Sequence, residues 1–379
     1  MRPGRRDGGA DTGRQQELAR SPMSARVLVA RLDSLGDVLI SGPAIRAVAA
    51  RADSVALLCG PRGRAAAALL PGVDHILEWD APWAGPEPGE VTAGGTIALL
   101  RLVRGFAPDA ALILTSFHQS PLPLALLLRL AGVGWTGAIC HDYPGGLLDL
   151  RHQLSEDAGL AEPERAVSLA AAAGYPLPAG DDGRLALSGP LPDATEITGP
   201  GPYLCLHPGT SAPARAWSAW RHAQAVRALA AAGHRVLVTG SAAERALTSQ
   251  AAAGCGADLG GRTTLAELAA VFAGASAVIA GNTGPAHLAA AAGTPVVSLF
   301  APTVPAHRWA PYGVDVALLG DQRARCAGSR ARTCPVPGHP CLSQVTAEDV
   351  VAAVGRLTGA PPMPAGARRP ASGQIGVAR

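Results

Sequence analysis

The apolar positions of this chain form short runs separated by amphipathic stretches, and the first series of them ends near residue 173. Its apolar runs cover 27–30, 55–59, 76–77, 110–114 and 134–139. Its stretches with helical spacing cover 42–50, 63–70, 96–105, 122–130 and 163–173. The runs are short enough for buried strands and the stretches long enough for helices. Strands that alternate with helices predict a parallel sheet with right-handed crossovers.

A second series follows the segment 174–202, which is rich in Pro, Gly and Asp and is the best linker candidate. Its strand-like runs cover 203–206, 235–239, 257–259, 277–280 and 296–300. Its helical stretches cover 219–231, 242–252, 265–272 and 347–357, and a short helix lies between the last two strands. Two such halves predict two Rossmann-like doubly wound domains that face a cleft.

We therefore expect an N-terminal domain over 23–190, a C-terminal domain over 200–345 and a closing helix over 346–358. The flanking tails, 1–22 and 360–379, are rich in Gly, Pro, Ala and Arg, which predicts disorder. The tails carry formal charges of +2 and +3 within a total of +3, so the body is slightly acidic. Basic residues gathered in tails give no support to nucleic-acid binding.

The composition is that of a globular enzyme, with 48% apolar and 16% charged residues among 379. The longest apolar stretch, 122–133, is interrupted by Arg129 and is too short to span a bilayer. The arginines at the N-terminus precede no apolar core, so no secretory signal is expected. We expect a cytoplasmic protein, working at most peripherally at the inner face of the cell membrane.

All 32 basic residues are arginine, which excludes any mechanism that needs a Schiff-base lysine. Seven cysteines are present, of which Cys326, Cys334 and Cys341 cluster with His339 near the end of the chain. Three thiols and an imidazole can bind zinc. Their wide spacing lacks a Cys-x-x-Cys pair, so a reduced or disulfide-prone loop is the favoured interpretation.

Three strand-to-helix turns carry polar residues that can do chemistry. The sequence 278–300 predicts a strand, a turn at 281–284, a short helix opened by Pro285, and another strand. Such a helix start offers free N–H groups to a phosphate, and His287 would lie one turn further on. A turn with Gly36 and Asp37 follows the first strand, and a Gly/Thr/Ser turn with Arg215 follows the strand ending at His207.

Neither half opens with the GxGxxG fingerprint of dinucleotide-binding proteins. The chain instead resembles glycosyltransferase family 9, the ADP-heptose heptosyltransferases. The resemblance is carried in family order by LGDVLISGPAIRAV, LHPGTSAPARAW, VLVTGSAAE, the stretch 258–303 and the closing Cys/His loop. It implies a GT-B architecture, with the acceptor on the first domain and the nucleotide sugar on the second. It also implies an inverting, metal-independent transfer with no cofactor.

The resemblance assigns roles to individual residues. Asp37 matches the catalytic base, and Glu244 matches the carboxylate that holds the ribose hydroxyls. The diphosphate matches fall on Thr210, Ser211, Arg215, Thr283, Gly284, Pro285 and His287. At Asn282 many members of the family carry aspartate, and at Arg215 they usually carry lysine.

Each role has a structural alternative. Asp37 could be a helix cap, Arg215 and Glu244 exposed surface residues, and His287 a histidine satisfied within a surface helix. On the acceptor side, Arg31, Asp33, His118, His141 and Arg151 are weaker candidates.

The sequence thus predicts a monomeric transferase that moves a heptose or related sugar, from a donor most simply ADP-linked, to a glycan or lipid-linked hydroxyl. An epimerase or isomerase of nucleotide sugars on the same architecture is the alternative. A non-catalytic nucleotide-binding protein is the third hypothesis.

Overall fold

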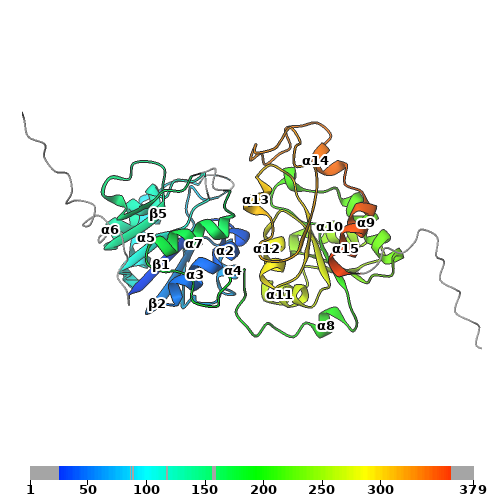
Figure 1. The fold of residues 1–379 in the computed structure, drawn as a ribbon, viewed down its shortest axis with the longest axis horizontal. Helices are drawn as coiled ribbons and strands as arrows, with labels where there is room; N and C mark the ends of the chain where they lie inside the picture. The colour runs from blue at the N-terminus through cyan, green and yellow to red at the C-terminus, as the bar shows by residue number, and fades with distance from the viewer. Residues whose placement is uncertain (1–24, 86, 88, 117, 156–158, 360–379) are drawn as a thin grey trace, which may run out of the picture.

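The computed structural model describes residues 25–359, except 86, 88, 117 and 156–158, so both expected tails lie outside the described residues. Two α/β domains lie side by side (Figure 1). Each contains one six-stranded parallel sheet. The expected pair of Rossmann-like doubly wound domains is therefore confirmed.

The N-terminal sheet has the order β3-β2-β1-β4-β5-β6. Its strands are β1 (Arg26–Arg31), β2 (Ser54–Cys59), β3 (His75–Glu78), β4 (Ala110–Ile113), β5 (Trp135–Ile139) and β6 (Leu150–His152). Its helices are α2 (Leu35–Ile40), α3 (Gly42–Ala49), α4 (Arg64–Ala67), α5 (Ala93–Phe106), α6 (Leu122–Ala131) and α7 (Glu162–Ala172), with a 3-10 turn, η1 (Gly145–Leu147). Strand β6 was not expected, because this short edge strand is half-buried and has no apolar run.

The C-terminal sheet has the order β12-β11-β10-β7-β8-β9. Its strands are β7 (Leu204–His207), β8 (Val236–Gly240), β9 (Ala257–Gly260), β10 (Ala277–Gly281), β11 (Val296–Leu299) and β12 (Val316–Leu319). Its helices are α9 (Ala219–Ala231), α10 (Arg245–Ala252), α11 (Leu265–Ala273), α12 (Gly284–Ala291), α13 (Ala306–Trp309), α14 (Pro340–Ser343) and α15 (Ala347–Thr358). Two 3-10 turns, η3 (Pro213–Arg215) and η4 (Ala242–Glu244), follow β7 and β8, and α8 (Thr195–Thr198) lies in the linker.

Both sheets have the same connectivity when their strands are counted from the first of each domain. In each domain the strand order reverses beside the first strand, between β1 and β4 and between β7 and β10. Ligands of doubly wound sheets bind outside the carboxyl ends of the strands at this point. Six strands are buried along their whole length: β4, β5, β7, β8, β10 and β11.

The two domains contact each other where these reversal points meet, through the first turns of α2 and α12. Gly36 of α2 and Gly284 of α12 leave room for this approach. A second contact is apolar and joins Ile40 of α2 to Ala290 and Ala291 of α12, with Leu185 of the linker between the domains. One buried apolar cluster contains residues of both sheets, so the interface continues the two cores.

Substitution of Gly36 by alanine tests how tightly the two helices meet. A Cβ at Gly36 would lie 2.9 Å from His287 Cδ2 and 3.3 Å from Gly284 Cα. A Cβ at Gly284 would meet Leu35 Cδ2 at 2.7 Å, the end of a flexible side chain. We expect Gly36→Ala to lower the free energy of unfolding by about 1–3 kcal/mol, and Gly284→Ala by less. Urea unfolding measures both, and wild-type stability of Gly36→Ala would contradict the close approach.

Candidate functional site

The domains enclose a cleft of about 390 Å³ at the reversal points of both sheets. The N-terminal domain lines it with Asp33, Ser34, Gly36, Asp37, Arg62, Ala84, Gly85, Ser116, His118 and Gln119. The C-terminal domain lines it with Ser211, Arg215, Asn282, Thr283, Gly284, His287, Val304, Trp309 and Arg332. Seven of the residues that the sequence predicts for the site therefore face one cavity: Asp37, Ser211, Arg215, Asn282, Thr283, Gly284 and His287.

Asp37 lies in the first turn of α2 and has both carboxylate oxygens engaged. Oδ2 accepts hydrogen bonds from the Ser34 backbone N–H at 3.1 Å and the Ser34 hydroxyl at 2.6 Å. Oδ1 accepts one from Arg31 Nη2 at 3.0 Å. Burial raises the pKa of Asp37, but the Arg31 charge and the Ser34 bonds outweigh it, so its pKa lies below the ordinary value. Asp37 is thus the third residue of α2, bonded back to the N-cap residue Ser34, and an ionised group that faces the cleft.

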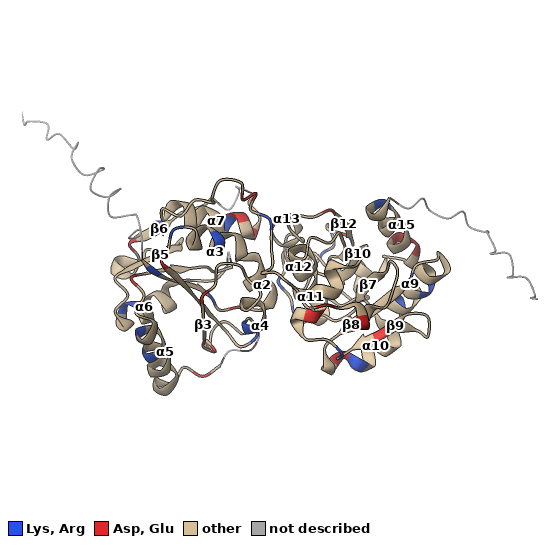
Figure 2. Ribbon diagram, turned by 90° about the horizontal axis from the view of Figure 1, so that it is seen from below, with Lys and Arg blue, Asp and Glu red and all other residues tan. Residues whose placement is uncertain are grey.

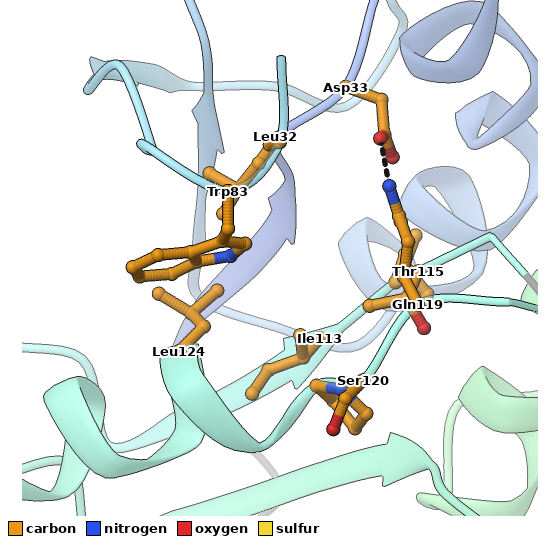
Figure 3. Close-up of a pocket in the computed structure, with 11 residues that line it drawn as sticks. Leu32, Asp33, Trp83, Ile113, Thr115, Gln119, Ser120 and Leu124 are labelled. Carbon is orange, nitrogen blue, oxygen red and sulfur yellow. Dashed lines mark hydrogen bonds between the residues drawn. The ribbon is translucent and has the colours of Figure 1, made fainter. Parts of the chain in front are cut away.

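Arg31 ends β1 and lies beneath Asp37, with 3% of its side chain exposed. Its guanidinium pairs with Asp33 at 3.0 Å and donates a hydrogen bond to Ser116 Oγ at 2.8 Å. The Asp33 carboxylate also accepts a hydrogen bond from Gln119 Nε2 (Figure 3). Burial raises the pKa of Asp33, and the neighbouring Asp37 charge adds to the rise against Arg31 and Gln119. One arginine therefore holds two carboxylates whose pKa values are shifted in opposite directions.

The C-terminal wall of the cleft begins with α12, whose eight residues start at Gly284. Thr283 is the N-cap residue, and its hydroxyl makes no capping bond in the structure. His287 is buried in the first turn, and its Nδ1 has no hydrogen-bond partner among the described residues. Burial lowers the pKa of His287 to about 4, against the raising effect of Asp37, so the imidazole is neutral at pH 7. This wall offers N–H groups and an imidazole to an anion.

Arg215 supplies the positive charge on the same wall. Its Nη1 donates to the Asn282 carbonyl at 3.4 Å, and its Nε is buried without a hydrogen-bond partner among the described residues. Burial lowers the pKa of Arg215, as does Arg332, while Asp37 raises it. A guanidinium that is mostly buried and incompletely bonded is suited to bind an oxyanion.

Asn282 is 5% exposed and braces the ends of two strands. Its Nδ2 donates to the Ala301 carbonyl at 3.2 Å, and its Oδ1 accepts from the Ala301 N–H at 3.4 Å. The first of these bonds needs an amide, because a carboxylate has no N–H to donate. The asparagine that departs from the common family residue is therefore matched to its backbone partner.

Three predicted donor residues do not line the cleft. Thr210 donates its hydroxyl to the Ala212 carbonyl at 3.1 Å. Glu244 accepts from the Ser241 N–H at 2.7 Å and hydroxyl at 2.8 Å, and lies 3.9 Å from His207 Nε2. Pro285 is the second residue of α12 and presents no polar group. Glu244 also lies over Gly209, where a Cβ would be 1.9 Å from its Oε1, so it stays beside the loop that carries Arg215.

Two smaller pockets adjoin the cleft in the N-terminal domain. One, of about 200 Å³, is polar and is lined by His118, His141, Asp142 and Arg165 among others. The other is apolar, has room for about 20 Å³ and lies between Trp83 and Leu124 (Figure 3). Of the weaker acceptor-side candidates, Asp33 and His118 line the cleft and His141 the polar pocket. Arg151 instead donates to the carbonyls of Cys140 and His141.

Sequence reasoning did not single out Arg62, Trp309 or Arg332, all of which line the cleft. Arg332 lies in the Cys/His loop, and its carbonyl accepts a hydrogen bond from the Ala214 N–H at 2.8 Å. His339 Nε2 lies 3.0 Å from the Ala214 carbonyl, a second link between this loop and the Arg215 segment. For Arg332, the sequence signal was the Cys/His loop itself, which the family resemblance matched without assigning a role to any residue in it.

All seven cysteines are free thiols. Among the described residues, no group of three or more His, Cys, Asp and Glu side chains is arranged to hold a metal ion. No helix in the described part of the chain is both long and apolar enough to cross a membrane. Charged residues of both signs occur on both domains (Figure 2).

Two facing Rossmann-like domains, each with a six-stranded parallel sheet, give the GT-B architecture. The sequence profile of glycosyltransferase family 9 (heptosyltransferase) matches residues 98–339. The chain belongs to this family and is a glycosyltransferase, which favours transfer over the epimerase alternative and over a non-catalytic role.

Solved structures with the same fold include ADP-heptose lipopolysaccharide heptosyltransferase II of E. coli, at 18% identity and a TM-score of 0.66 over 88% of this chain and 98% of that one. A family 9 glycosyltransferase from Veillonella parvula DSM 2008 is 16% identical, with a TM-score of 0.70 over 90% of this chain and 99% of that one. E. coli heptosyltransferase WaaC with ADP-2-deoxy-2-fluoro heptose is 21% identical, with a TM-score of 0.65 over 87% of this chain and 99% of that one. The dodecameric iron-containing E. coli heptosyltransferase TibC is 16% identical, with a TM-score of 0.50 over 89% of this chain and 78% of that one. No curated protein sequence matches the chain.

The Asn282 amide is expected to be required for the shape of the donor wall. Asn282→Asp removes the bond to the Ala301 carbonyl and places a buried carboxylate against it. We expect a loss of about 1–3 kcal/mol in the free energy of unfolding, measured by urea denaturation. The loss should shrink as the pH falls and the new carboxylate takes up a proton. A stability equal to that of the wild type at neutral pH would show that the brace is not needed.

Proposed function

We propose that this family 9 enzyme transfers heptose, or a closely related sugar, from an ADP-linked donor to a hydroxyl of a glycan or lipid-linked acceptor, with inversion at the anomeric carbon. Family membership supports the transfer, and the ADP-heptose analogue named with the E. coli relative supports the donor. The observation that carries the proposal is that Asp37 lies across one cleft from Arg215 and the start of α12.

The donor diphosphate is proposed to lie between Arg215 and the first turn of α12. Negative charge accumulates on the departing diphosphate as the bond to the sugar breaks. The N–H groups at the helix start, the Thr283 hydroxyl and the Arg215 guanidinium are placed to offset that charge. His287 is neutral at pH 7 and contributes a hydrogen bond rather than a full charge. Glu244 is assigned to the ribose hydroxyls, since it lies beside the loop that leads to Arg215.

Asp37 is proposed to accept the proton of the acceptor hydroxyl as that oxygen attacks the anomeric carbon. Its lowered pKa keeps it ionised throughout the neutral range. A base with such a low pKa is weak, so its contribution depends on how closely it is held to the hydroxyl. Arg31 and Ser34 hold the carboxylate from two sides, which fixes its orientation toward the cleft. A single displacement of this kind inverts the anomeric centre.

Asparagine variants of the two carboxylates on Arg31 test the assignment of the base. Asp37→Asn is expected to lower kcat by roughly 10²-fold or more, while ADP affinity stays within about twofold. Asp33→Asn keeps an oxygen that can accept the hydrogen bond from Gln119, so its kcat should fall less than that of Asp37→Asn. Initial rates of ADP release and calorimetric titration with ADP measure the two quantities. Equal losses in both variants, or a larger loss in Asp33→Asn, would move the role of base to Asp33.

The pH profile of the wild type follows from the same groups. Because the pKa of Asp37 is lowered, its basic form is lost only when the pH falls through that lowered value. His287, with a pKa of about 4, takes up a proton only in the same acidic range. We expect kcat/KM to stay level from about pH 7 down to about pH 5. A steep acid limb centred near pH 6 would indicate a different titrating group.

Transfer is proposed to proceed without a metal ion, because Arg215 and the α12 start already face the diphosphate position. We expect turnover to persist in EDTA. The iron named with TibC makes iron a necessary arm of the experiment, alongside Mg²⁺ and Mn²⁺. Complete loss of activity on chelation, restored by one of these ions, would contradict the metal-independent mechanism. Operation as a cytoplasmic monomer, with peripheral membrane contact, stays a prediction.

A further inference from the structure

A buried cluster of charged side chains lies behind the cleft, next to the residues that hold Asp37. Its centre is Glu162, the first residue of α7, whose side chain is 2% exposed. Glu162 Oε1 lies 3.3 Å from Arg165 Nε and 4.0 Å from Arg308 Nη1. Arg165 belongs to the same helix, but Arg308 belongs to α13 of the other domain. Glu162 therefore takes part in an ion pair that crosses the domain interface.

Glu162 also acts on the group that holds the proposed base. Among the charges around Glu162, Arg31 has the largest effect in lowering its pKa, followed by Arg165 and Arg308. These three arginines oppose the burial that raises the pKa of Glu162. Arg31 in turn bonds Asp37 Oδ1 at 3.0 Å. Glu162 is thus ion-paired with Arg308 across the interface, and its charge acts on the guanidinium that bonds Asp37.

Arg308 contributes one of the positive charges that balance the carboxylates of this cluster. Three buried or half-buried carboxylates, Asp33, Asp37 and Glu162, face three buried guanidiniums, Arg31, Arg165 and Arg308. Without Arg308, Glu162 has one guanidinium fewer to balance its buried charge. An excess buried charge is costly, whereas a fully paired cluster is tolerated. The balance therefore favours the arrangement in which α13 lies against α7.

The same seam is supported by other contacts. The Tyr312 hydroxyl donates a hydrogen bond to Glu164 Oε1 at 3.2 Å, from the donor domain to the first turn of α7. Trp309, which follows Arg308, lines the cleft and packs against the apolar contact around Ile40. The segment 308–312 thus joins the cleft wall to α7.

We propose that Glu162 is a positioning residue that couples docking of the two domains to the alignment of Asp37, through Arg308 on one side and Arg31 on the other. This inference rests on the proposed role of Asp37 and goes beyond it. Docking of α13 brings Arg308 to Glu162. The negative charge of Glu162 then favours the position of Arg31 in which the Arg31 guanidinium bonds Asp37. Neither Glu162 nor Arg308 lines the cleft, so both act through other residues.

The test uses the full chain with the variants Glu162→Gln, Arg308→Gln, Arg308→Lys and the double variant Glu162→Gln/Arg308→Gln. The control is Asp149→Asn, which removes an arginine-paired carboxylate of the same domain that does not line the cleft. Small-angle scattering, with and without ADP, reports how closely the domains dock. Rates of ADP release from ADP-heptose give kcat and the donor KM.

We expect each single glutamine variant to show a larger radius of gyration than the wild type. Each should lose roughly 3- to 30-fold in kcat, with the donor KM within about twofold, because neither side chain reaches the donor. Arg308→Lys keeps the charge and should recover most of the rate. The double variant restores the charge balance, so its loss should not exceed that of the worse single variant. Asp149→Asn should match the wild type in radius and rate.

Wild-type radii and rates in both single variants would overturn the proposal. So would losses that multiply in the double variant, or a failure of Arg308→Lys to recover activity, since either result means independent structural effects. The scattering arm without ADP needs no assumption about the donor. If the wild type neither binds ADP nor consumes ADP-heptose, the proposed function fails, while the radii still decide whether Glu162 and Arg308 hold the domains together.

Discussion

The close approach of the first turns of α2 and α12 is the constraint on which the site depends. Each helix begins at the point where the strand order of its own sheet reverses, so each carries its domain's ligand-facing groups. Gly36 and Gly284 let the two helix starts meet with little side-chain volume between them. A carboxylate from one domain and the start of a helix from the other are thereby brought to one cavity.

The electrostatic arrangement follows from that approach. Burial at the interface would by itself disfavour the charged form of Asp37. The hydrogen bonds from Arg31 and Ser34 stabilise that charge. Arg31 is itself buried, so it needs the carboxylates around it. The charged groups of the N-terminal wall are therefore held in one polar network, whereas on the C-terminal wall Arg215 Nε and His287 Nδ1 have no hydrogen-bond partner among the described residues. This difference is what a site for a displaced diphosphate and a fixed base requires.

Much of the fold was predictable because parallel strands buried on both faces give continuous apolar runs. The edge strands β6 and β12 were missed. Both are only partly buried, and β6 has no apolar run, whereas β12 is apolar throughout and was overlooked. The helix after β1 was expected as one element over 42–50. It instead begins at Leu35 and restarts at Gly42, next to Pro43, which cannot donate a backbone hydrogen bond.

The site was predictable where one local motif supplies both backbone and side chain, as at Asp37 and at 283–287. Glu244 forms a capping box with Ser241, a pattern that the spacing Ser-x-x-Glu could have shown. The brace from Asn282 to Ala301 and the pair of Glu162 with Arg308 join residues distant in sequence, and no local pattern encodes such contacts.

The most direct measurement is a crystal structure of the protein with ADP bound. We expect the diphosphate between the Arg215 guanidinium and the first N–H groups of α12, with the Asp37 carboxylate facing it across the cleft. A diphosphate bound away from α12, or an Asp37 carboxylate turned away from the cleft in the complex, would contradict it.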